Sequence, residues 1–166
     1  MNRKIILTVI VLLAATFAIG GYFYKDTYYY NSAIKNSNPS TCSKITKDIT
    51  NSNCLAKIAF NKEDASVCAN SPKMYTVQCF SLFAEMNGSI RKCQKVTPTV
   101  DEYNCYTAFA NTKKSTLICD NLTGEKKDYC YQAVAISNND ISICNNLPTS
   151  SVIKAGCANS VKYFNP

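Results

Sequence analysis

Ten cysteines recur along this chain of 166 residues at a nearly constant interval. They are Cys42, Cys54, Cys68, Cys79, Cys93, Cys105, Cys119, Cys130, Cys144 and Cys157. Starting from the first, every second cysteine follows the previous one of its series by 25 or 26 residues. A fixed period of this length indicates tandem repeats, in which each unit buries its apolar face against its neighbours. The spacing therefore predicts five repeat units over residues 38–166.

Each predicted unit begins with a residue suited to capping a helix. Four positions before the first cysteine of the unit stand Asn38, Asp64, Ser89, Ser115 and Asp140. Such side chains accept hydrogen bonds from the free amides of a helix's first turn. Three positions after that cysteine stand Ile45, Ser71, Val96, Leu122 and Leu147, one turn further along the same face. Proline, glycine or threonine follows, so the pattern predicts a short helix that ends there.

The second cysteine of each unit lies in a longer helical pattern. Four positions after it stand Ile58, Phe83, Phe109, Val134 and Val161. The next position holds Ala59, Ala84, Ala110 and Ala135, with Lys162 in the last unit. Apolar groups at these spacings form one stripe on a helix, and the alanine leaves room for a neighbouring helix. The predicted fold is all-α: a solenoid-like stack of five short helical hairpins, preceded by an N-terminal membrane or signal helix.

A sixth, incomplete pattern precedes the first unit. The second cysteine of one unit precedes the first cysteine of the next by 14 residues in all four cases. Counting back by the same step from Cys42 gives Tyr28, and five residues further on is Ala33, where the pattern has alanine. Residues 24–37 are therefore predicted to be a degenerate half-repeat that caps the stack.

An even number of cysteines behind an apolar N-terminus predicts a disulfide framework in an oxidising compartment. Two regular pairing schemes are compatible with the repeat. Pairing between units leaves Cys42 and Cys157 without partners at opposite ends. Pairing within units uses every cysteine, as Cys42–Cys54, Cys68–Cys79, Cys93–Cys105, Cys119–Cys130 and Cys144–Cys157. The second scheme is preferred for that reason.

The N-terminal segment, residues 1–23, predicts export from the cytoplasm. Arg3 and Lys4 precede an uncharged apolar run over residues 5–23, which is long enough to span a bilayer as a helix. One interpretation is a retained membrane anchor, with Tyr22, Phe23 and Tyr24 at the interface. The alternative is a cleaved signal peptide, for which the small residues of Ala18-Ile19-Gly20 are suited. Both place the rest of the chain outside the cytoplasm.

Several kinds of chemistry have no support in the sequence. The chain has no histidine, which excludes histidine-based catalysis and imidazole metal ligands. No two cysteines are closer than 11 residues, whereas thiolate zinc sites use closely spaced pairs. The adjacent acids Glu63-Asp64 and Asp101-Glu102 are interpreted as residues of helix starts. We therefore predict no catalytic residue, no metal and no cofactor.

A possible binding face combines tyrosines with lysines near two consecutive long helices. Its members are Tyr103, Tyr106, Lys113, Lys114, Lys126, Lys127, Tyr129 and Tyr131. With a formal net charge of +7, such a face suits glycans or anionic polymers. The alternative is that these tyrosines pack between hairpins. Nucleic acid is not a predicted partner, because Arg91 is the one arginine beyond the leader.

Tandem helical hairpins that each carry one cysteine pair, such as Cys68 with Cys79, resemble the Sel1-like cysteine-rich repeat proteins. The resemblance covers residues 38–166. The unit here is shorter than the Sel1-like unit and its cysteines lie further apart. The resemblance implies an interaction scaffold of the cell envelope, and no functional residue is carried over from that family.

These observations predict an extracytoplasmic scaffold of the cell envelope that is anchored in the membrane by residues 5–23 and has no catalytic activity. Its partner would be a protein or an anionic envelope polymer. The alternatives are a secreted effector, which requires cleavage of the leader, and a hydrolase-like protein that acts on cell-wall material.

Overall fold

The computed structural model describes residue 21 and residues 24–97 and 99–164. Within these ranges every regular element is a helix, which confirms the predicted all-α class. The predicted membrane segment at residues 5–23 lies, apart from Gly21, outside the described residues. Among the described helices, none is both long and apolar enough to cross a bilayer.

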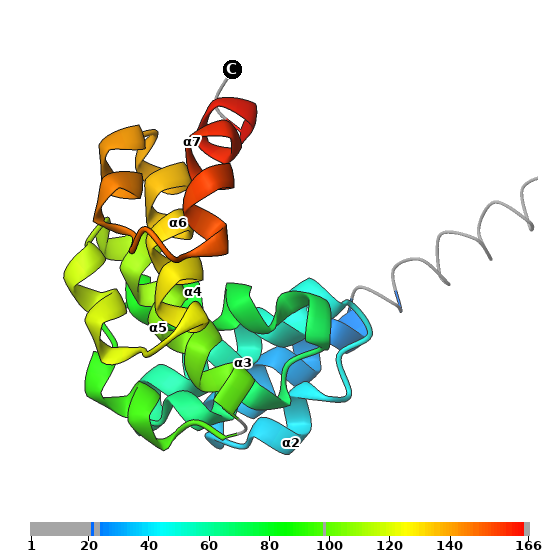
Figure 1. The fold of residues 1–166 in the computed structure, drawn as a ribbon. Coiled ribbons are helices and arrows are strands. Elements are labelled where there is room, and N and C mark those ends of the chain that lie inside the picture. Colours follow the sequence, from blue (N-terminus) through cyan, green and yellow to red (C-terminus); the bar gives the residue numbers. More distant parts are fainter. Residues whose placement is uncertain (1–20, 22–23, 98, 165–166) are drawn as a thin grey trace, which may run out of the picture.

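Each unit pairs a short helix with a longer one (Figure 1). The short helices are α2 (Pro39–Cys42), η1 (Ala65–Asn70), η3 (Ile90–Lys95), η4 (Thr116–Asn121) and η5 (Ile141–Asn146). The longer helices are α3 (Asp48–Lys62), α4 (Thr76–Glu85), α5 (Thr99–Lys113), α6 (Glu125–Asn138) and α7 (Val152–Phe164). A single turn, η2 (Lys73–Tyr75), precedes α4, and residues 24–35 form a further helix before the first unit.

Four of the five short helices are 3₁₀ helices, a type that the sequence pattern did not distinguish from α-helix. In every unit the amide three residues after the first cysteine donates to that cysteine's carbonyl, over 2.9 to 3.2 Å. After η1, η3, η4 and η5 the backbone becomes extended at this residue. The i→i+3 bonds of a 3₁₀ helix let a six-residue segment close two turns and stop.

The predicted caps are correct for the acidic and amide residues and wrong for the two serines. The side-chain oxygens of Asn38, Asp64 and Asp140 accept from the amide two residues further on, over 2.9 to 3.0 Å. Ser89 and Ser115 make no such bond. The longer Asp and Asn side chains reach that amide as an Asx-turn, which the hydroxyl forms more weakly.

All ten cysteines form disulfides within their own units, in the pairing that the sequence analysis preferred. The paired Cα atoms are 5.5 to 5.9 Å apart. Nine of the cysteines have no exposed surface and Cys144 has 4 %. Each bridge joins a short helix to its long partner and lies inside the apolar core.

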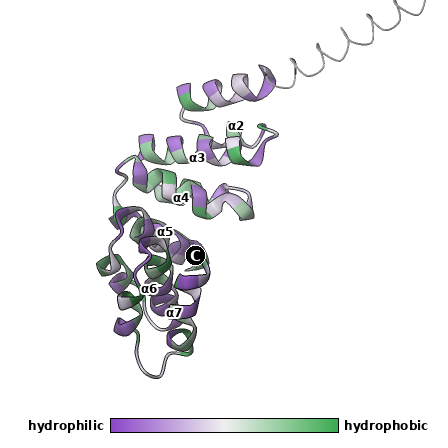
Figure 2. Ribbon diagram, turned by 90° about the horizontal axis from the view of Figure 1, so that it is seen from above, coloured by the Kyte–Doolittle hydropathy of each residue, from purple (hydrophilic) through white to green (hydrophobic). Residues whose placement is uncertain are grey.

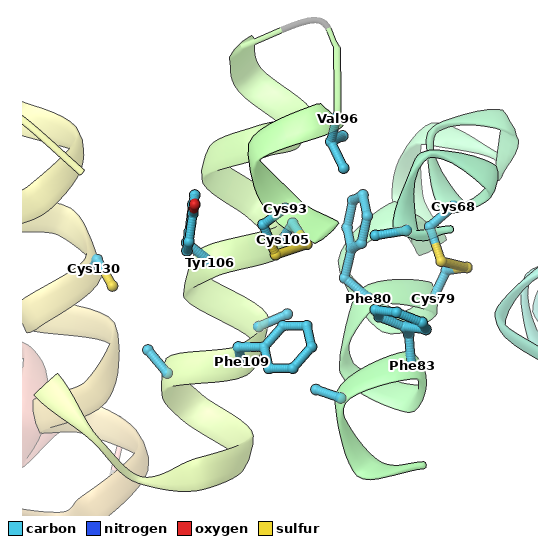
Figure 3. Close-up of a cluster of buried hydrophobic side chains, with 14 of the residues drawn as sticks. Cys68, Cys79, Phe80, Phe83, Cys93, Val96, Cys105, Tyr106, Phe109 and Cys130 are labelled. Atoms are coloured by element: carbon cyan, nitrogen blue, oxygen red, sulfur yellow. A yellow bond between two sulfur atoms is a disulfide. The ribbon is translucent and has the colours of Figure 1, made fainter. Parts of the chain in front are cut away.

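The predicted apolar stripe of the long helices forms that core. The residues four and five positions after the second cysteine are buried in every unit, except for Lys162 at the end of the stack. Figure 3 shows the junction of the second and third units, where the rings of Phe83 and Phe109 meet edge to face at 5.8 Å between centroids. Gly88 lies against Phe83 so closely that a Cβ there would come within 2.6 Å of the ring.

The long helices of the first four units end in the same way. Glu63, Asn87, Lys114 and Asn139 have φ values of 49° to 61°, in the left-handed region that stops a helix. In three of these units the next amide donates to the carbonyl of the recurring alanine, Ala59, Ala110 or Ala135, and in the second unit it donates to that of Phe83. The alanine position therefore serves both close packing and helix termination.

The helix at residues 24–35 shares these features. Ser37 has a φ of 48°, the Asn38 amide donates to the Ala33 carbonyl over 3.0 Å, and Ala33 has no exposed surface. Ala33 is thus buried and accepts the same terminating hydrogen bond as the recurring alanine of the long helices, which supports the interpretation of residues 24–37 as a half-repeat.

Asp26 ties this first helix to the start of α3. Its carboxylate accepts from the Thr46 amide and hydroxyl, each over 2.9 Å, and from the Lys47 amide over 3.3 Å. Burial alone raises the pKa of Asp26, but the hydrogen bonds from Thr46 and Lys47 outweigh burial and hold the pKa below its ordinary value of 3.8. A carboxyl of lowered pKa stabilises the fold above its unfolded pKa, and this contribution is lost as the pH falls through the lowered pKa.

We expect the substitution Asp26→Asn to lower the free energy of unfolding at neutral pH by about 1–3 kcal/mol, because an amide replaces the charged acceptor. The difference from the parent should shrink below about pH 4, where the parent's carboxyl also becomes neutral. Urea unfolding at a series of pH values measures this difference in the free energy of unfolding. The exposed Glu85→Gln serves as the control, and a difference that stays constant down to the lowest pH would contradict the assignment.

The stack is continuous but bent. Each long helix packs against the next one, from α3 to α7. Figure 2 shows α3 and α4 side by side, whereas the axes of α5, α6 and α7 run in a different direction. The two ends of the stack therefore face different directions.

Candidate functional site

The tyrosines and lysines of the predicted binding face, at residues 103–131, do not form one surface. Tyr106 is 2 % exposed and belongs to the core, where burial raises the pKa of its phenol. Lys113 lies at the end of α5, and its ammonium donates to Asn87 over 3.1 Å. Lys114 follows it, and its carbonyl accepts from Asn138 at the end of α6 over 3.5 Å. These two lysines therefore lie where the long helices end.

The other members lie at the opposite edge of the stack, where the long helices begin. Lys126, Lys127, Tyr129 and Tyr131 are in the first two turns of α6. Tyr103, in the first turns of α5, is their neighbour: burial raises the pKa of its phenol, and Tyr129 raises it further. A helix of α6's length spans about 20 Å, so the two groups of residues cannot contact one small ligand together.

A groove of about 450 Å³ opens beside the start of α6. One wall comes from α6 and the other from the segment that joins η5 to α7. The lining residues are Gly124, Glu125, Lys127, Asp128, Tyr131, Asn146, Leu147, Pro148, Ser150, Ser151 and Val152. Of the eight predicted residues, Lys127 and Tyr131 line this groove.

Asp120 of η4 bonds to both Lys127 and Tyr131. The Lys127 ammonium is 2.8 Å from the Asp120 carboxylate, and the Tyr131 hydroxyl donates to the same oxygen over 3.1 Å. The bond from Lys127 is the main cause that lowers the pKa of Asp120, and Asp120 in turn raises the pKa of Lys127. Burial and Asp120 both raise the pKa of Tyr131, so its phenol is a hydrogen-bond donor at neutral pH. The ammonium also lies 5.9 Å from the Tyr131 ring centroid.

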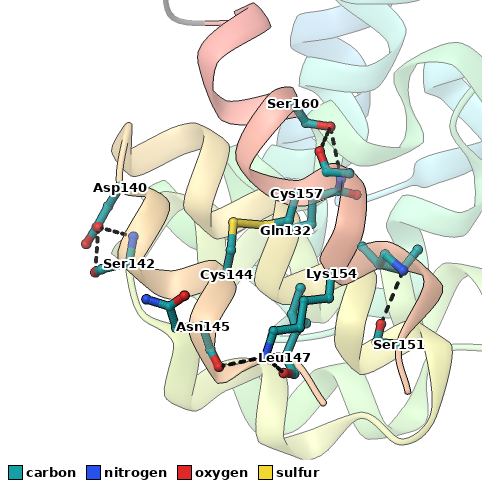
Figure 4. The surroundings of a disulfide bond; sticks show 12 residues. Gln132, Asp140, Ser142, Cys144, Asn145, Leu147, Ser151, Lys154, Cys157 and Ser160 are labelled. Atoms are coloured by element: carbon teal, nitrogen blue, oxygen red, sulfur yellow. Dashed lines mark hydrogen bonds between the residues drawn. A yellow bond between two sulfur atoms is a disulfide. The ribbon is translucent and has the colours of Figure 1, made fainter. Parts of the chain in front are cut away.

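Hydrogen bonds hold the second wall in place (Figure 4). The Lys154 ammonium donates to the carbonyls of Asn145, over 3.3 Å, and Leu147, over 2.7 Å. The Ser151 hydroxyl oxygen accepts from the Ile153 amide over 3.3 Å at the start of α7. The disulfide between Cys144 and Cys157 joins η5 to α7, the two helices that this wall connects. Contacts within the chain therefore position both walls of the groove.

The groove is lined by charged, polar and apolar side chains. Glu125 and Asp128 supply carboxylates, Lys127 supplies an ammonium group, and the serines supply hydroxyls. Val152 adds an apolar side chain that is 76 % exposed. Such a lining suits a ligand that carries hydrogen-bond donors and apolar groups together. It does not present the purely positive surface that an anionic polymer prefers.

Asp128 was not singled out in the sequence, although the repeat contains a signal for it. It stands two positions before the second cysteine of its unit, as Ser52 does, and Asp26 stands two positions before Tyr28. Asp26 accepts from the amides just before α3, and Ser52 donates to the Tyr75 carbonyl just before α4 over 2.8 Å. In these two cases the position faces the start of the next long helix, and at the fourth unit Asp128 lines the groove.

The adjacent acids lie at helix starts and ends. Asp64 caps η1 and accepts from the Ser66 amide, while Glu63 is exposed and lies 3.8 Å from the Lys92 ammonium. Asp101 and Glu102 occupy the first turn of α5. Across the part of the chain that the structure describes, no group of three acidic or cysteine side chains is placed to hold a metal ion.

No protein-family model, no curated protein and no solved structure matches this chain. The similarity to Sel1-like repeats therefore rests on architecture alone: helices, and disulfides that recur about every 25 residues.

Proposed function

We propose that this chain is an extracytoplasmic binding protein of the cell envelope, anchored in the membrane by residues 5–23 and without catalytic activity. The five buried disulfides suggest an oxidising compartment outside the cytoplasm. The apolar run next to Arg3 and Lys4 supports export and anchoring. The absence of histidine from the sequence removes histidine-based catalysis from the alternatives.

The observation that carries the proposal is the groove between α6 and α7. Its walls are fixed by the Asp120–Lys127–Tyr131 cluster and by the bonds of Lys154. A site that is already ordered loses little conformational entropy on binding. Because carboxylates lie beside the ammonium group, a segment of a partner protein fits this lining better than an anionic polymer does.

Site-specific crosslinking in the protein's own cells tests this. A photo-reactive amino acid is placed at Val152, in the groove, or at Met74, an equally apolar side chain in the second unit; these side chains are 76 % and 88 % exposed. We expect a discrete crosslinked product from position 152 and none from position 74. Equal yields at the two positions would exclude the groove as the binding site.

A second set of variants tests the role of the Asp120–Lys127–Tyr131 cluster in binding. Tyr131→Ala removes the ring and the hydroxyl that donates to Asp120, and should lower the crosslinking yield at position 152 on the order of tenfold. Tyr163→Ala, at an exposed tyrosine near the other end of α7, is the matched control and should leave the yield unchanged. Loss of wall-degrading activity in the double substitution Asp101→Asn, Glu102→Gln would instead support the hydrolase alternative.

A further inference from the structure

The outward face of the helix at residues 24–35 carries exposed aromatic side chains. Tyr24 is 75 % exposed and Tyr28 is 59 % exposed, one helical turn apart. A shallow hollow of about 440 Å³ runs along the same face. It is lined by Tyr24, Thr27, Tyr28, Asn31, Ser32, Lys35 and Asn36. No described element covers these two tyrosines.

Folding brings two ammonium groups beside the next tyrosine of this helix. The Lys25 ammonium lies 6.0 Å and the Lys44 ammonium 5.7 Å from the centroid of the Tyr29 ring. Lys25 belongs to the helix itself, whereas Lys44 comes from the turn after α2. The ring face attracts both cations. Two positive charges therefore lie beside one surface tyrosine, where they favour an anionic ligand.

The neighbouring carboxylate is already engaged in bonds to the backbone. Asp26 is 5 % exposed and accepts hydrogen bonds from the Thr46 and Lys47 amides. The outward surface formed by Tyr24, Lys25, Tyr28, Tyr29 and Lys44, here called the tyrosine–lysine cluster, consequently carries positive charge and aromatic rings. Tyrosines are enriched at both boundaries between lipid and water, and ammonium groups near a bilayer surface attract anionic headgroups.

The position of the tyrosine–lysine cluster in the chain also indicates a membrane surface. Tyr24 directly follows the apolar run of residues 5–23. From Tyr24 to Tyr29 a helix rises about 8 Å, and the headgroup layer on one side of a bilayer is roughly 5–8 Å thick. If residues 5–23 span the hydrocarbon core, Lys25, Tyr28 and Tyr29 reach the headgroups of the outer leaflet.

We propose that the tyrosine–lysine cluster docks on anionic phospholipid headgroups. The ammonium groups of Lys25 and Lys44 bind lipid phosphate, and Tyr24 and Tyr28 lie among the headgroups. Because Asp26 fixes the same helix to α3, docking would set the orientation of the whole stack relative to the membrane. This inference rests on the proposed anchoring and adds a lipid-binding surface to it.

The sequence has no tryptophan, so Tyr28→Trp introduces a single fluorescent reporter into the cluster. Tyr163→Trp, at a side chain that is 79 % exposed near the C-terminus, is the distal control. The full-length variants are reconstituted into phosphatidylcholine vesicles and into equimolar phosphatidylcholine–phosphatidylglycerol vesicles. Flotation measures anchoring, and quenching by lipids brominated near the headgroup measures docking. We expect strong quenching of the tryptophan at position 28 in the mixed vesicles and little at position 163.

Charge variants test the role of the lysines. The double substitution Lys25→Gln, Lys44→Gln should lower the ratio of docked to undocked protein on the order of tenfold, as the loss of two charges near an anionic surface implies. Lys73→Gln with Lys95→Gln changes the net charge equally at exposed positions of other units and should have little effect.

The other outcomes separate the two proposals. If neither reporter protein floats with vesicles, the anchoring is wrong, and the docking that depends on it is overturned too. If both float but the tryptophan at position 28 is quenched no more than that at position 163, anchoring stands and docking is overturned. Quenching that is equal in the two kinds of vesicle would overturn the assignment to anionic headgroups.

Discussion

Reduction of the five disulfides should unfold the helical stack. Each bridge joins cysteines 11 to 13 residues apart and stabilises the fold by roughly 3 kcal/mol in the chain-entropy model. A domain of this size has a net stability of about 5–15 kcal/mol, so the loss of five bridges is comparable to the whole of it.

The length of the helices strengthens this expectation. The short helices have four to six residues and the long ones 10 to 15, and isolated helices of such lengths are marginal in water. All the bridges lie inside the core, so reduction also places thiols where packed disulfides had been. Local helix formation therefore cannot preserve the fold once the bridges are gone.

Far-UV circular dichroism measures the effect. The protein is reduced and alkylated, and its helical signal at about 37 °C is compared with that of an unreduced sample treated in the same buffer. We expect most of the helical signal to be lost. An unchanged signal after complete reduction, with ten alkylated cysteines shown by mass, would mean that apolar packing alone stabilises the stack.

The second large effect is expected at Phe83. Its ring has no exposed surface, contacts Phe109 across the junction of the second and third units, and lies against Gly88 (Figure 3). Phe83→Ala removes this ring from a core that cannot collapse fully, because the disulfides Cys68–Cys79 and Cys93–Cys105 fix the backbone on both sides. We expect a loss of about 3–5 kcal/mol in the free energy of unfolding.

Urea unfolding with the disulfides intact measures this loss. Phe83→Leu should cost less, because it retains apolar volume and loses chiefly the edge-to-face contact with Phe109, a contact of about 0.5–1.5 kcal/mol. Met74→Ala, at a side chain that is 88 % exposed, should change stability by less than about 0.5 kcal/mol. If Phe83→Ala were as mild as Met74→Ala, the junction would not be part of a single cooperative core.

The repeat allowed much of the architecture to be predicted from the sequence. The positions that bury Ile58, Phe83 and Val134 follow from helical periodicity, which is a local property of the chain. The pairing of each cysteine followed from the requirement that no cysteine be left over at either end. The two serine caps were predicted wrongly, because whether a side chain reaches an amide depends on backbone geometry that the sequence pattern does not contain.

The binding face shows where the pattern failed. Tyr106 and Tyr131 occupy the same place in consecutive units, one position after the second cysteine. Tyr106 is buried in the core, while Tyr131 is half-buried and bonds to Asp120 at the groove. The repeat gives the two tyrosines equivalent positions, and the different packing at the two junctions gives them different environments.

The sequence by itself determined the all-α class, the period of the units and the apolar stripe, and it favoured the pairing of cysteines within units over the pairing between units. These depend on spacing along the chain and on helical geometry, which each unit repeats. Only the tertiary structure decided the bend of the stack, the tie between Asp26 and α3, the groove between α6 and α7, and the cluster of Lys25 and Lys44 around Tyr29. These features join residues of different elements, and they depend on how neighbouring units pack, which a repeat pattern does not specify.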